Sequence, residues 1–274
     1  MHYSNKVGSS ETTRGTLSDN NFNSLNLDLT FKYWFIGFTE GDGSFIVDKK
    51  RGYLEFKVTQ SSVDAQILFY IKKQLKFGSV SKQSKASNTH HFRVRNQKDI
   101  LKLIHIFNGN LLTEKKKIQF RFWLIAFNKK YDKNIRYTPN NSDVNLNNAW
   151  LSGFSDAEGC FTASAIKRSE KYTQVQIRYI LSQKEEKKLM SEIAKLFDGK
   201  ISYLKSYNGY NMTVNLLKLK KVINYFKKYP LKTKKYIDYL NWLKVFSLVS
   251  DKEHFTKIGL NKIKNLINKI NKKS

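Results

Sequence analysis

The sequence of 274 residues lacks the residue types that build disulfide scaffolds and small zinc domains. A single cysteine, Cys160, excludes a framework of disulfides within the chain. Only five histidines are present, and their spacing is not that of zinc ligands, which argues against a zinc finger. They are His2, His90, His91, His105 and His254.

Long apolar runs are also absent. No stretch approaches the ~18–20 residues that cross a bilayer, so we expect no transmembrane helix and no membrane partner. The chain begins Met1-His2-Tyr3-Ser4-Asn5, without the apolar core of a secretory signal. Residues 1–29 are rich in Ser, Asn and Thr, and this composition predicts a flexible N-terminal arm.

Acidic residues are scarce relative to basic ones. The chain has 50 Lys and Arg against 22 Asp and Glu, a net charge of +28. Such an excess repels itself in a compact state unless a polyanion relieves it. Nucleic acid is the polyanion that fits best, and a basic membrane-surface or ribosomal protein is the simpler alternative. Lys, Asn, Ile and Tyr are frequent, as in AT-rich organelle genomes, so we expect an organelle-encoded protein of a mitochondrion or chloroplast.

Two stretches of the chain are copies of each other. The first runs from Trp34 to Phe45 (WFIGFTEGDGSF) and the second from Trp150 to Phe161 (WLSGFSDAEGCF), an offset of 150 − 34 = 116. Trp, Gly, Phe, Gly and Phe recur in register. Each copy has acids at its seventh and ninth positions, and these are Glu40, Asp42, Asp156 and Glu158.

The repeated pattern predicts a short, mostly apolar helix in each copy. Small residues four positions apart share one helix face and let two backbones approach closely. These pairs are Gly37 with Gly41 and Gly153 with Ala157. The glycines that follow, Gly43 and Gly159, are predicted to end the helices in the left-handed conformation.

The ninth-position acids then lie at helix C-termini. A carboxylate there faces the negative end of the helix dipole, which costs up to ~1 kcal/mol. If the two helices pack together, Asp42 and Glu158 also repel each other. A divalent cation beside them would remove both penalties. Packing helices with solvated acids at their ends are the simpler alternative, which the repetition of the motif makes less attractive.

Periodicity predicts the same order of elements in each half, beginning with the motif helix: helix-strand-strand-helix-strand-strand-helix. Strands with one apolar and one polar face are typical of a half-exposed antiparallel sheet. Residues 128–148, with Pro139 among Lys, Asn, Tyr and Asp, have a linker composition. The predicted divisions are an arm at 1–29, a first half at 30–128, a linker at 129–148, a second half at 149–250 and an amphipathic C-terminal helix at 251–274, which we expect to pack outside the second half.

Both motifs resemble the LAGLIDADG motif of homing endonucleases, in the form with two motifs on one chain. The Gly, the acid-small-acid-Gly ending and the trailing Phe occur twice, and the resemblance covers roughly residues 30–250. It implies an α+β fold of two pseudo-symmetric αββαββα repeats. The motif helices would pack at the centre, and two antiparallel sheets would form a basic saddle along double-stranded DNA.

Phosphodiester hydrolysis needs an activated water and neutralisation of charge, and Mg²⁺ held by hard carboxylate ligands supplies both. The resemblance implies that Asp42 and Glu158 bind the metal, helped by the backbone carbonyls of Gly41 and Ala157. Mn²⁺ or Ca²⁺ would substitute for binding. Glu40 and Asp156 are expected to be structural, capping or hydrogen-bonding near the interface.

Family members have a polar residue and a lysine near each active site. Gln60 and Gln183 end corresponding strands, and the repeated L-x-T-x-K places Lys115 with Lys235, so the resemblance implies these four as further catalytic residues. A solvated helix start in a lysine-rich chain is the alternative for the lysines, and Lys234 could take the place of Lys235.

DNA recognition is expected from polar residues on the outward strand faces. Arg suits guanine, and Gln or Asn suits adenine. The candidates are Lys57, Thr59, Arg93 and Arg95 in the first half, and Gln174, Gln176, Arg178, Asn211, Thr213 and Asn215 in the second. The halves differ at nearly all of these positions, so we expect an asymmetric target.

The resemblance therefore implies a monomeric homing endonuclease that makes a metal-dependent double-strand break in a long DNA site. One alternative is an RNA-splicing maturase on the same fold, with its own intron RNA as partner. The other is a catalytically silent basic DNA-binding or ribosomal protein.

Overall fold

The computed structural model describes residues 27–170 and 172–270. It confirms the predicted α+β fold, with two similar halves that follow one another along the chain. The predicted arm lies outside the described residues, apart from residues 27–29. In the first half the elements are α1 (Leu29–Asp42), β1 (Gly43–Asp48), β2 (Tyr53–Ser61), η2 (Ser62–Asp64), α2 (Ala65–Leu75), β3 (Ser79–Lys82), β4 (Thr89–Val94), α3 (Gln97–Phe107) and α4 (Glu114–Tyr131).

The second half repeats this order and adds a C-terminal helix. Its elements are α5 (Trp150–Glu158), β5 (Gly159–Lys167), β6 (Thr173–Lys184), α6 (Lys187–Leu196), β7 (Lys200–Leu204), η3 (Lys205–Tyr207), β8 (Gly209–Asn215), η4 (Leu216–Lys218), α7 (Leu219–Lys228), α8 (Lys235–Ser250), η5 (Glu253–Phe255) and α9 (Lys257–Ile267).

Each half contains one antiparallel sheet of four strands, ordered β1-β2-β4-β3 and β5-β6-β8-β7. Leu54, Phe56 and Val58 of β2 are buried, and they alternate with side chains on the opposite face, as a strand requires. β6 alternates in the same way, with Ile177 and Tyr179 buried. One face of each sheet therefore packs on helices, and the other carries the polar residues.

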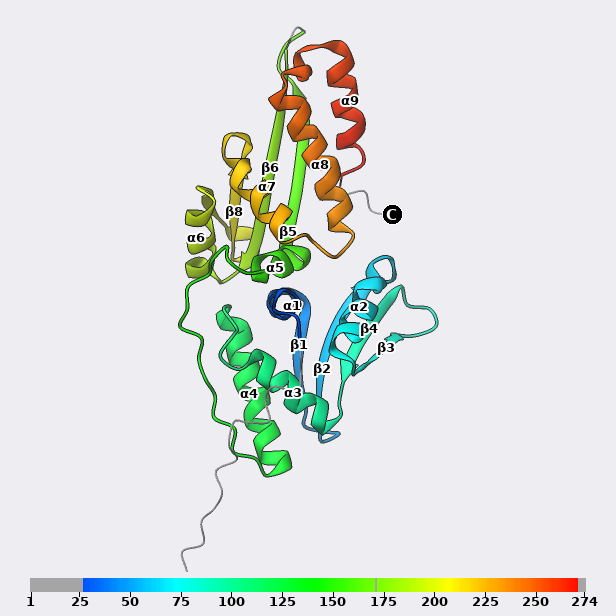
Figure 1. Ribbon diagram of the computed structural model, residues 1–274, viewed down its shortest axis with the longest axis vertical. Coiled ribbons are helices and arrows are strands. Elements are labelled where there is room, and N and C mark those ends of the chain that lie inside the picture. Colours follow the sequence, from blue (N-terminus) through cyan, green and yellow to red (C-terminus); the bar gives the residue numbers. More distant parts are fainter. Residues whose placement is uncertain (1–26, 171, 271–274) are drawn as a thin grey trace, which may run out of the picture.

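The motif helices α1 and α5 lie at the junction of the two halves, and the sheets extend from them in opposite directions (Figure 1). α1 begins at Leu29 because the Asp28 side chain accepts a hydrogen bond from the Phe31 N–H at 2.7 Å. Both helices are buried along most of their length. The segment between α4 and α5 runs along the outside and connects the halves (Figure 1).

The left-handed helix ends predicted at Gly43 and Gly159 are wrong. Gly43 has φ −82° and ψ 157°, and Gly159 has φ −80° and ψ 152°, so both are extended. Glycine is required there for space instead. A Cβ at Gly43 would lie 2.8 Å from the Thr39 carbonyl oxygen, and one at Gly159 would lie 2.7 Å from that of Ser155. The absent side chain lets the chain turn directly from helix into strand.

Polar side chains also set where two helices begin. The second strand of the β3–β4 pair ends at Val94, since the Asn96 side chain accepts hydrogen bonds from the N–H groups of Lys98 and Asp99 and starts α3. The C-terminal helix α9 begins at Lys257 and not at the predicted residue 251, because the Thr256 side chain accepts a hydrogen bond from the Gly259 N–H. It packs against α8 and β5, with Ile263 fully buried. Within residues 27–170 and 172–270, no helix has both the length and the apolar character that a membrane span requires.

Candidate active site

The two motif helices cross with their backbones in contact, as the small residues predict. A Cβ at Gly37 would lie 1.9 Å from the Trp150 carbonyl oxygen, and one at Gly153 would lie 1.8 Å from that of Trp34. A Cβ at Gly41 would lie 2.2 Å from the Cβ of Ala157. The two faces therefore meet over a full helical turn, which fixes how far apart the acids at the helix ends are.

The seventh-position acids join the halves. Asp156 accepts a hydrogen bond from the Trp34 Nε1 at 2.8 Å, although the two residues belong to different halves. In the mirror contact, Glu40 accepts from the Trp150 Nε1. Neither contact could be deduced from the sequence, although the tryptophans open both motifs.

The same two acids also bind the segments that lead into α4 and α8. Glu40 accepts hydrogen bonds from the backbone N–H groups of Leu112 and Thr113, and Asp156 accepts from those of Lys232 and Thr233. Burial raises the pKa of Glu40, and the hydrogen bonds oppose this effect only in part, so the pKa is about 7. Glu40 and Asp156 are thus structural groups at the interface.

The ninth-position acids lie at the ends of the crossed helices. The Gln60 Nε2 donates to the Asp42 Oδ2 at 2.6 Å. Glu158 has the corresponding hydrogen bond with Gln183, which lowers its pKa. Burial raises the pKa of both acids, and the charge of Asp42 raises that of Glu158 further. The two carboxylates are therefore close enough to repel each other, and Gln60 and Gln183 lie beside them as predicted.

One lysine in each half lies beside the acids, and in the first half it is Lys116 instead of Lys115. Lys115 is exposed, and its backbone N–H donates to the Glu186 Oε1 at 3.1 Å. Lys116 is 7% exposed and donates through its Nζ to the Gly43 carbonyl. Burial lowers its pKa, and the charges of Glu40, Asp42 and Glu158 raise it.

In the second half, Lys235 has this position. Its Nζ donates to the Ala157 carbonyl at 2.8 Å and to the Ser155 carbonyl at 3.3 Å. Burial lowers its pKa, and the charges of Asp156, Asp42 and Glu158 raise it. The alternative, Lys234, instead donates its backbone N–H to the Asp64 Oδ1 at 3.0 Å. The two cations therefore flank the pair of acids from opposite halves.

The site fits a divalent cation that both acids would bind together with other oxygen donors. Asp42 and Glu158 are hard donors whose mutual repulsion a cation would relieve. A Cβ at Gly41 would lie 3.3 Å from the Glu158 Oε1, so the backbone of one motif lies against the acid of the other. No group of three or more His, Cys, Asp and Glu suited to a metal exists in the described parts of the chain. Carbonyl groups, water and phosphate would therefore complete the coordination.

The candidate DNA-binding residues occupy the sheet faces that do not pack on helices. Strand pairing places Lys57 opposite Arg93, and Arg178 opposite Asn215. Arg95 follows the end of β4, and its guanidinium lies 4.6 Å from the centre of the Tyr53 ring. The remaining candidates, Thr59, Gln174, Gln176, Asn211 and Thr213, lie in β2, β6 and β8 and alternate with core residues.

Several of these polar groups already have partners within the protein. The Thr59 Oγ1 and the His91 Nδ1 lie 2.9 Å apart. The Gln174 Oε1 accepts from the Arg168 Nε at 3.0 Å, and the Asn211 Oδ1 accepts from the Tyr207 hydroxyl at 2.7 Å. His91 thus has its partner on the neighbouring strand, where Thr59 lies opposite it.

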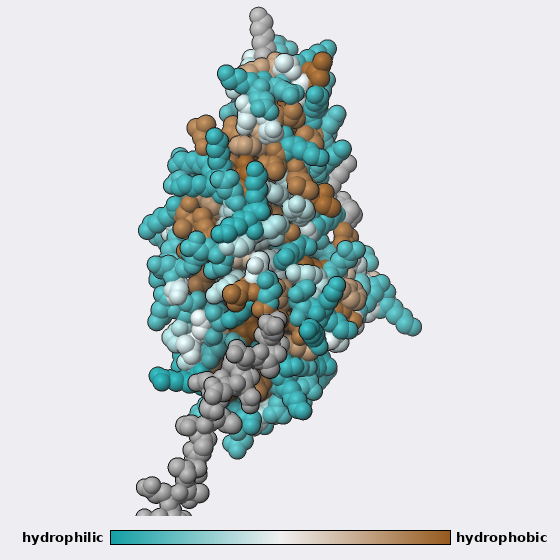
Figure 2. Space-filling view, in the orientation of Figure 1, coloured by the Kyte–Doolittle hydropathy of each residue, from teal (hydrophilic) through white to brown (hydrophobic). Residues whose placement is uncertain are grey.

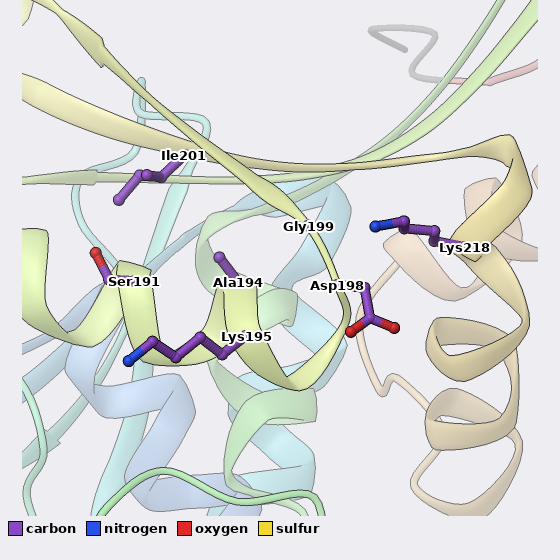
Figure 3. A pocket seen from close by; sticks show the side chains of 7 residues that line it. All are labelled: Ser191, Ala194, Lys195, Asp198, Gly199, Ile201 and Lys218. Carbon is purple, nitrogen blue, oxygen red and sulfur yellow. The ribbon is translucent and has the colours of Figure 1, made fainter.

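A separate hollow of about 490 Å³ lies between α6, β7 and η4 (Figure 3). It is lined by Ser191, Ala194, Lys195, Asp198, Gly199, Ile201 and Lys218. None of the acids, glutamines or flanking lysines described above lines it. Hydrophilic side chains cover most of the face seen in Figure 2, with small separate groups of hydrophobic ones.

The fold and the site define a pseudo-symmetric protein with one carboxylate of each half at a shared interface. A family model described as LAGLIDADG endonuclease matches residues 35–127 and 151–246, one match in each half. The chain belongs to this family.

The comparisons with individual proteins agree. The "Probable intron-encoded endonuclease 4" of Neurospora crassa is 55% identical over 243 residues, covering 88% of this chain and 44% of that protein. This chain thus spans less than half the length of that relative. The "Uncharacterized cox1 intron-2 37.2 kDa protein" of Schizosaccharomyces pombe is 36% identical over 240 residues, 86% of this chain and 72% of that one. The crystal structure of the LAGLIDADG meganuclease I-AabMI bound to uncleaved DNA matches with a TM-score of 0.75 and 26% identity, over 88% of this chain and 99% of that one.

Proposed function

We propose that this protein is a site-specific DNA endonuclease that makes a double-strand break with the help of a divalent metal ion, Mg²⁺ in the cell. One observation carries the proposal. Asp42 and Glu158 come from the two halves, lie together at the ends of the crossed helices, and each has a glutamine and a lysine beside it. The N. crassa relative is named an endonuclease, and the I-AabMI structure contains DNA.

When bound, the cation would activate water and stabilise charge on the reacting phosphate. Asp42 and Glu158 would hold it, together with the carbonyl groups of Gly41 and Ala157. Gln60 and Gln183 orient the two carboxylates through their hydrogen bonds. Lys116 and Lys235 place positive charge where the phosphates of the two strands would approach, and positioned charge of this kind stabilises a developing oxyanion.

The two sheets would lie along the major groove on either side of the cleavage position. Lys57, Arg93 and Arg95 are predicted to contact DNA in the first half together with Thr59. The second half offers Arg178 and the amide and hydroxyl side chains named above. Because the faces differ in charge and shape, the target is an asymmetric sequence. Residues 30–128 and 149–250 would each recognise one half of it, joined by the linker at 129–148.

Both acids belong to one chain, so the site is complete without a second copy, and we propose a monomer. The relatives are described as intron-encoded or as a product of a cox1 intron. We therefore also propose an origin in an organelle genome. Sedimentation of the purified protein with and without duplex DNA tests the monomer: one chain per duplex is expected, and a two-chain complex would refute it.

The test of the nuclease is cleavage of a library of duplexes that carry candidate intron-insertion sites, in Mg²⁺. The wild-type protein is compared with Asp42→Asn and Glu158→Gln. The matched control is Glu114→Gln, which removes an acid whose side chain is 71% exposed on α4. One sequence should be cut by the wild type and the control, and chelation with EDTA should stop the cleavage. Loss of the double-strand break is expected for Asp42→Asn and Glu158→Gln. Undiminished cleavage by either would refute its assigned role.

A second candidate function is assistance of RNA splicing. The "Intron-encoded RNA maturase bI4" of Saccharomyces cerevisiae is 28% identical over 210 residues, 76% of this chain and 31% of that protein. The host intron RNA would then be a partner in addition to DNA, or in its place. Tight binding of that RNA, with no cleavage of any duplex in the library, would favour this function over the nuclease.

A further inference from the structure

A buried acid lies on the sheet face that we propose contacts DNA. Glu55 is in β2, on the same face as Lys57 and Thr59, yet it is only 3% exposed. A carboxylate on such a face repels phosphate, and a buried charge is costly unless it is paired. Its presence in a protein of net charge +28 therefore needs a specific reason.

The partners of Glu55 are two of the arginines proposed to bind DNA. The Arg95 Nε donates to the Glu55 Oε2. The Arg93 Nε lies 3.7 Å from the Glu55 Oε1, so Glu55 forms an ion pair with Arg93 too, although the Arg93 Nε has no hydrogen-bond partner among the described residues. The ring of Tyr53 lies 4.6 Å from the Arg95 guanidinium and supports it from a second side.

These contacts hold the arginines without covering them. The side chains of Arg93 and Arg95 remain 32% and 51% exposed, whereas that of Glu55 is 4% exposed. The contacts with Glu55 are made through Nε, and the terminal nitrogens of an arginine are those that reach a guanine edge as a fork. Arginine is a flexible side chain, and fixing it before binding reduces the entropy lost in the complex.

The second half has the opposite charge at the corresponding place. Gln60 and Gln183 are equivalent because each binds the acid of its own half. Glu55 precedes Gln60 by as many residues as Arg178 precedes Gln183 (60 − 55 = 183 − 178). Glu55 and Arg178 are therefore at corresponding positions in the two halves. The neighbouring strand places Asn215 opposite Arg178. The acid is therefore particular to the first half.

We infer that Glu55 is a positioning residue for sequence recognition, which orients Arg93 and Arg95 toward guanines in the first half of the target. The inference rests on the proposed function, because it requires a duplex DNA target. Glu55 itself touches no base. Its negative charge weakens the general attraction of this face to phosphate. By orienting the two arginines, it strengthens the discrimination between bases at two positions.

The test is selection of bound sites from a library of random duplexes in Ca²⁺, followed by sequencing. Arg93→Lys and Arg95→Lys keep the charge and remove the fork, so each should lose a guanine preference and thereby identify its position. Glu55→Met removes both acceptor oxygens and should weaken the preference at both positions together, by roughly fivefold or more. Glu55→Gln, which keeps one acceptor, should lie between Glu55→Met and the wild type. Binding to random-sequence DNA should become tighter in both Glu55 variants.

The control Glu253→Gln removes an equal charge on η5, where Glu253 lies 3.7 Å from the Lys262 Nζ. It should leave every preference unchanged, and thermal melts of all variants report folding. Three results would overturn the inference: no effect of Glu55→Met at the two arginine positions, an equal loss across the whole site, or an intact consensus in both Arg→Lys variants. If the wild type itself selects no consensus, the proposed function fails as well, which separates the two failures.

Discussion

Adding one methyl group where the motif helices cross should destabilise the protein far more than adding it elsewhere. In Gly153→Ala the new Cβ would lie 1.8 Å from the Trp34 carbonyl oxygen and 2.8 Å from the Phe38 nitrogen. Both are backbone atoms, so α1 and α5 must move apart by more than 1 Å to reach ordinary contact. Alanine itself favours a helix over glycine by about 1 kcal/mol, which offsets part of the cost.

Separation of the helices loosens packing and lengthens the contacts between Trp34 and Asp156 and between Trp150 and Glu40. Overpacking of a core costs about 1–3 kcal/mol, and a buried hydrogen bond that is broken costs about 1–3 kcal/mol more. After the gain in helix propensity, we expect the free energy of unfolding to fall by about 3 kcal/mol. Urea unfolding followed by tryptophan fluorescence and circular dichroism measures this quantity.

Gly52→Ala is the matched control. Gly52 has φ +65° and no atom near its absent Cβ, so alanine there meets only the left-handed backbone penalty of about 1 kcal/mol. If Gly153→Ala loses no more stability than Gly52→Ala, the close approach of the two helices is not what requires glycine. An unchanged rate of DNA cleavage in a destabilised Gly153→Ala would refute the further claim that this contact fixes the separation of Asp42 and Glu158.

Three further predictions concern single side chains. Lys116→Met should slow DNA cleavage by about 100-fold or more, whereas Lys115→Met should change it little, because Lys116 lies beside the acids and Lys115 is exposed; equal rates for the two would contradict the assignment of Lys116 to the active site. Trp34→Phe should lower the free energy of unfolding by about 1–2 kcal/mol more than Trp123→Phe, since both tryptophans are fully buried but only the Trp34 Nε1 has a hydrogen-bond partner; urea unfolding of the pair decides. Burial lowers the pKa of His91 from 6.5, so its neutral ring stabilises the fold above that pH, and this contribution is lost as the pH falls below it. Unfolding curves between about pH 5 and about pH 8 should therefore show less acid destabilisation in His91→Gln, and parallel curves would refute the assignment.

The central helices and their acids could be predicted because the motif occurs twice in register. A single copy would have left the roles of Asp42 and Glu158 open, since an acid at a helix end is common. The small residues predicted the close crossing, and alternation of apolar and polar residues predicted the strands. These signals lie within one element, where sequence separation corresponds directly to position on a face.

The features that escaped prediction depend on where separate elements meet. Matching Thr113 with Thr233 paired Lys115 with Lys235, but α4 starts directly after Thr113 and α8 starts one residue later after Thr233. The two helices therefore begin differently after the threonine, and the lysine that lies beside the acids is Lys116 in the first half (116 − 113 = 3) and Lys235 in the second (235 − 233 = 2). Glu55 meets Arg95 across a separation of 40 residues, through the register of two strands that the sequence does not specify.

The paired contacts of Trp34 with Asp156 and of Trp150 with Glu40 make the two halves dependent on each other in evolution. Each half supplies a donor that the other half's buried acid needs, and each acid also binds the segment before the last long helix of its own half, α4 or α8. A hybrid of one half with the corresponding half of a relative inherits a working interface only if both tryptophans and both acids come with it. The outer strand faces carry no such requirement, so target preference can diverge in one half while the junction stays constant.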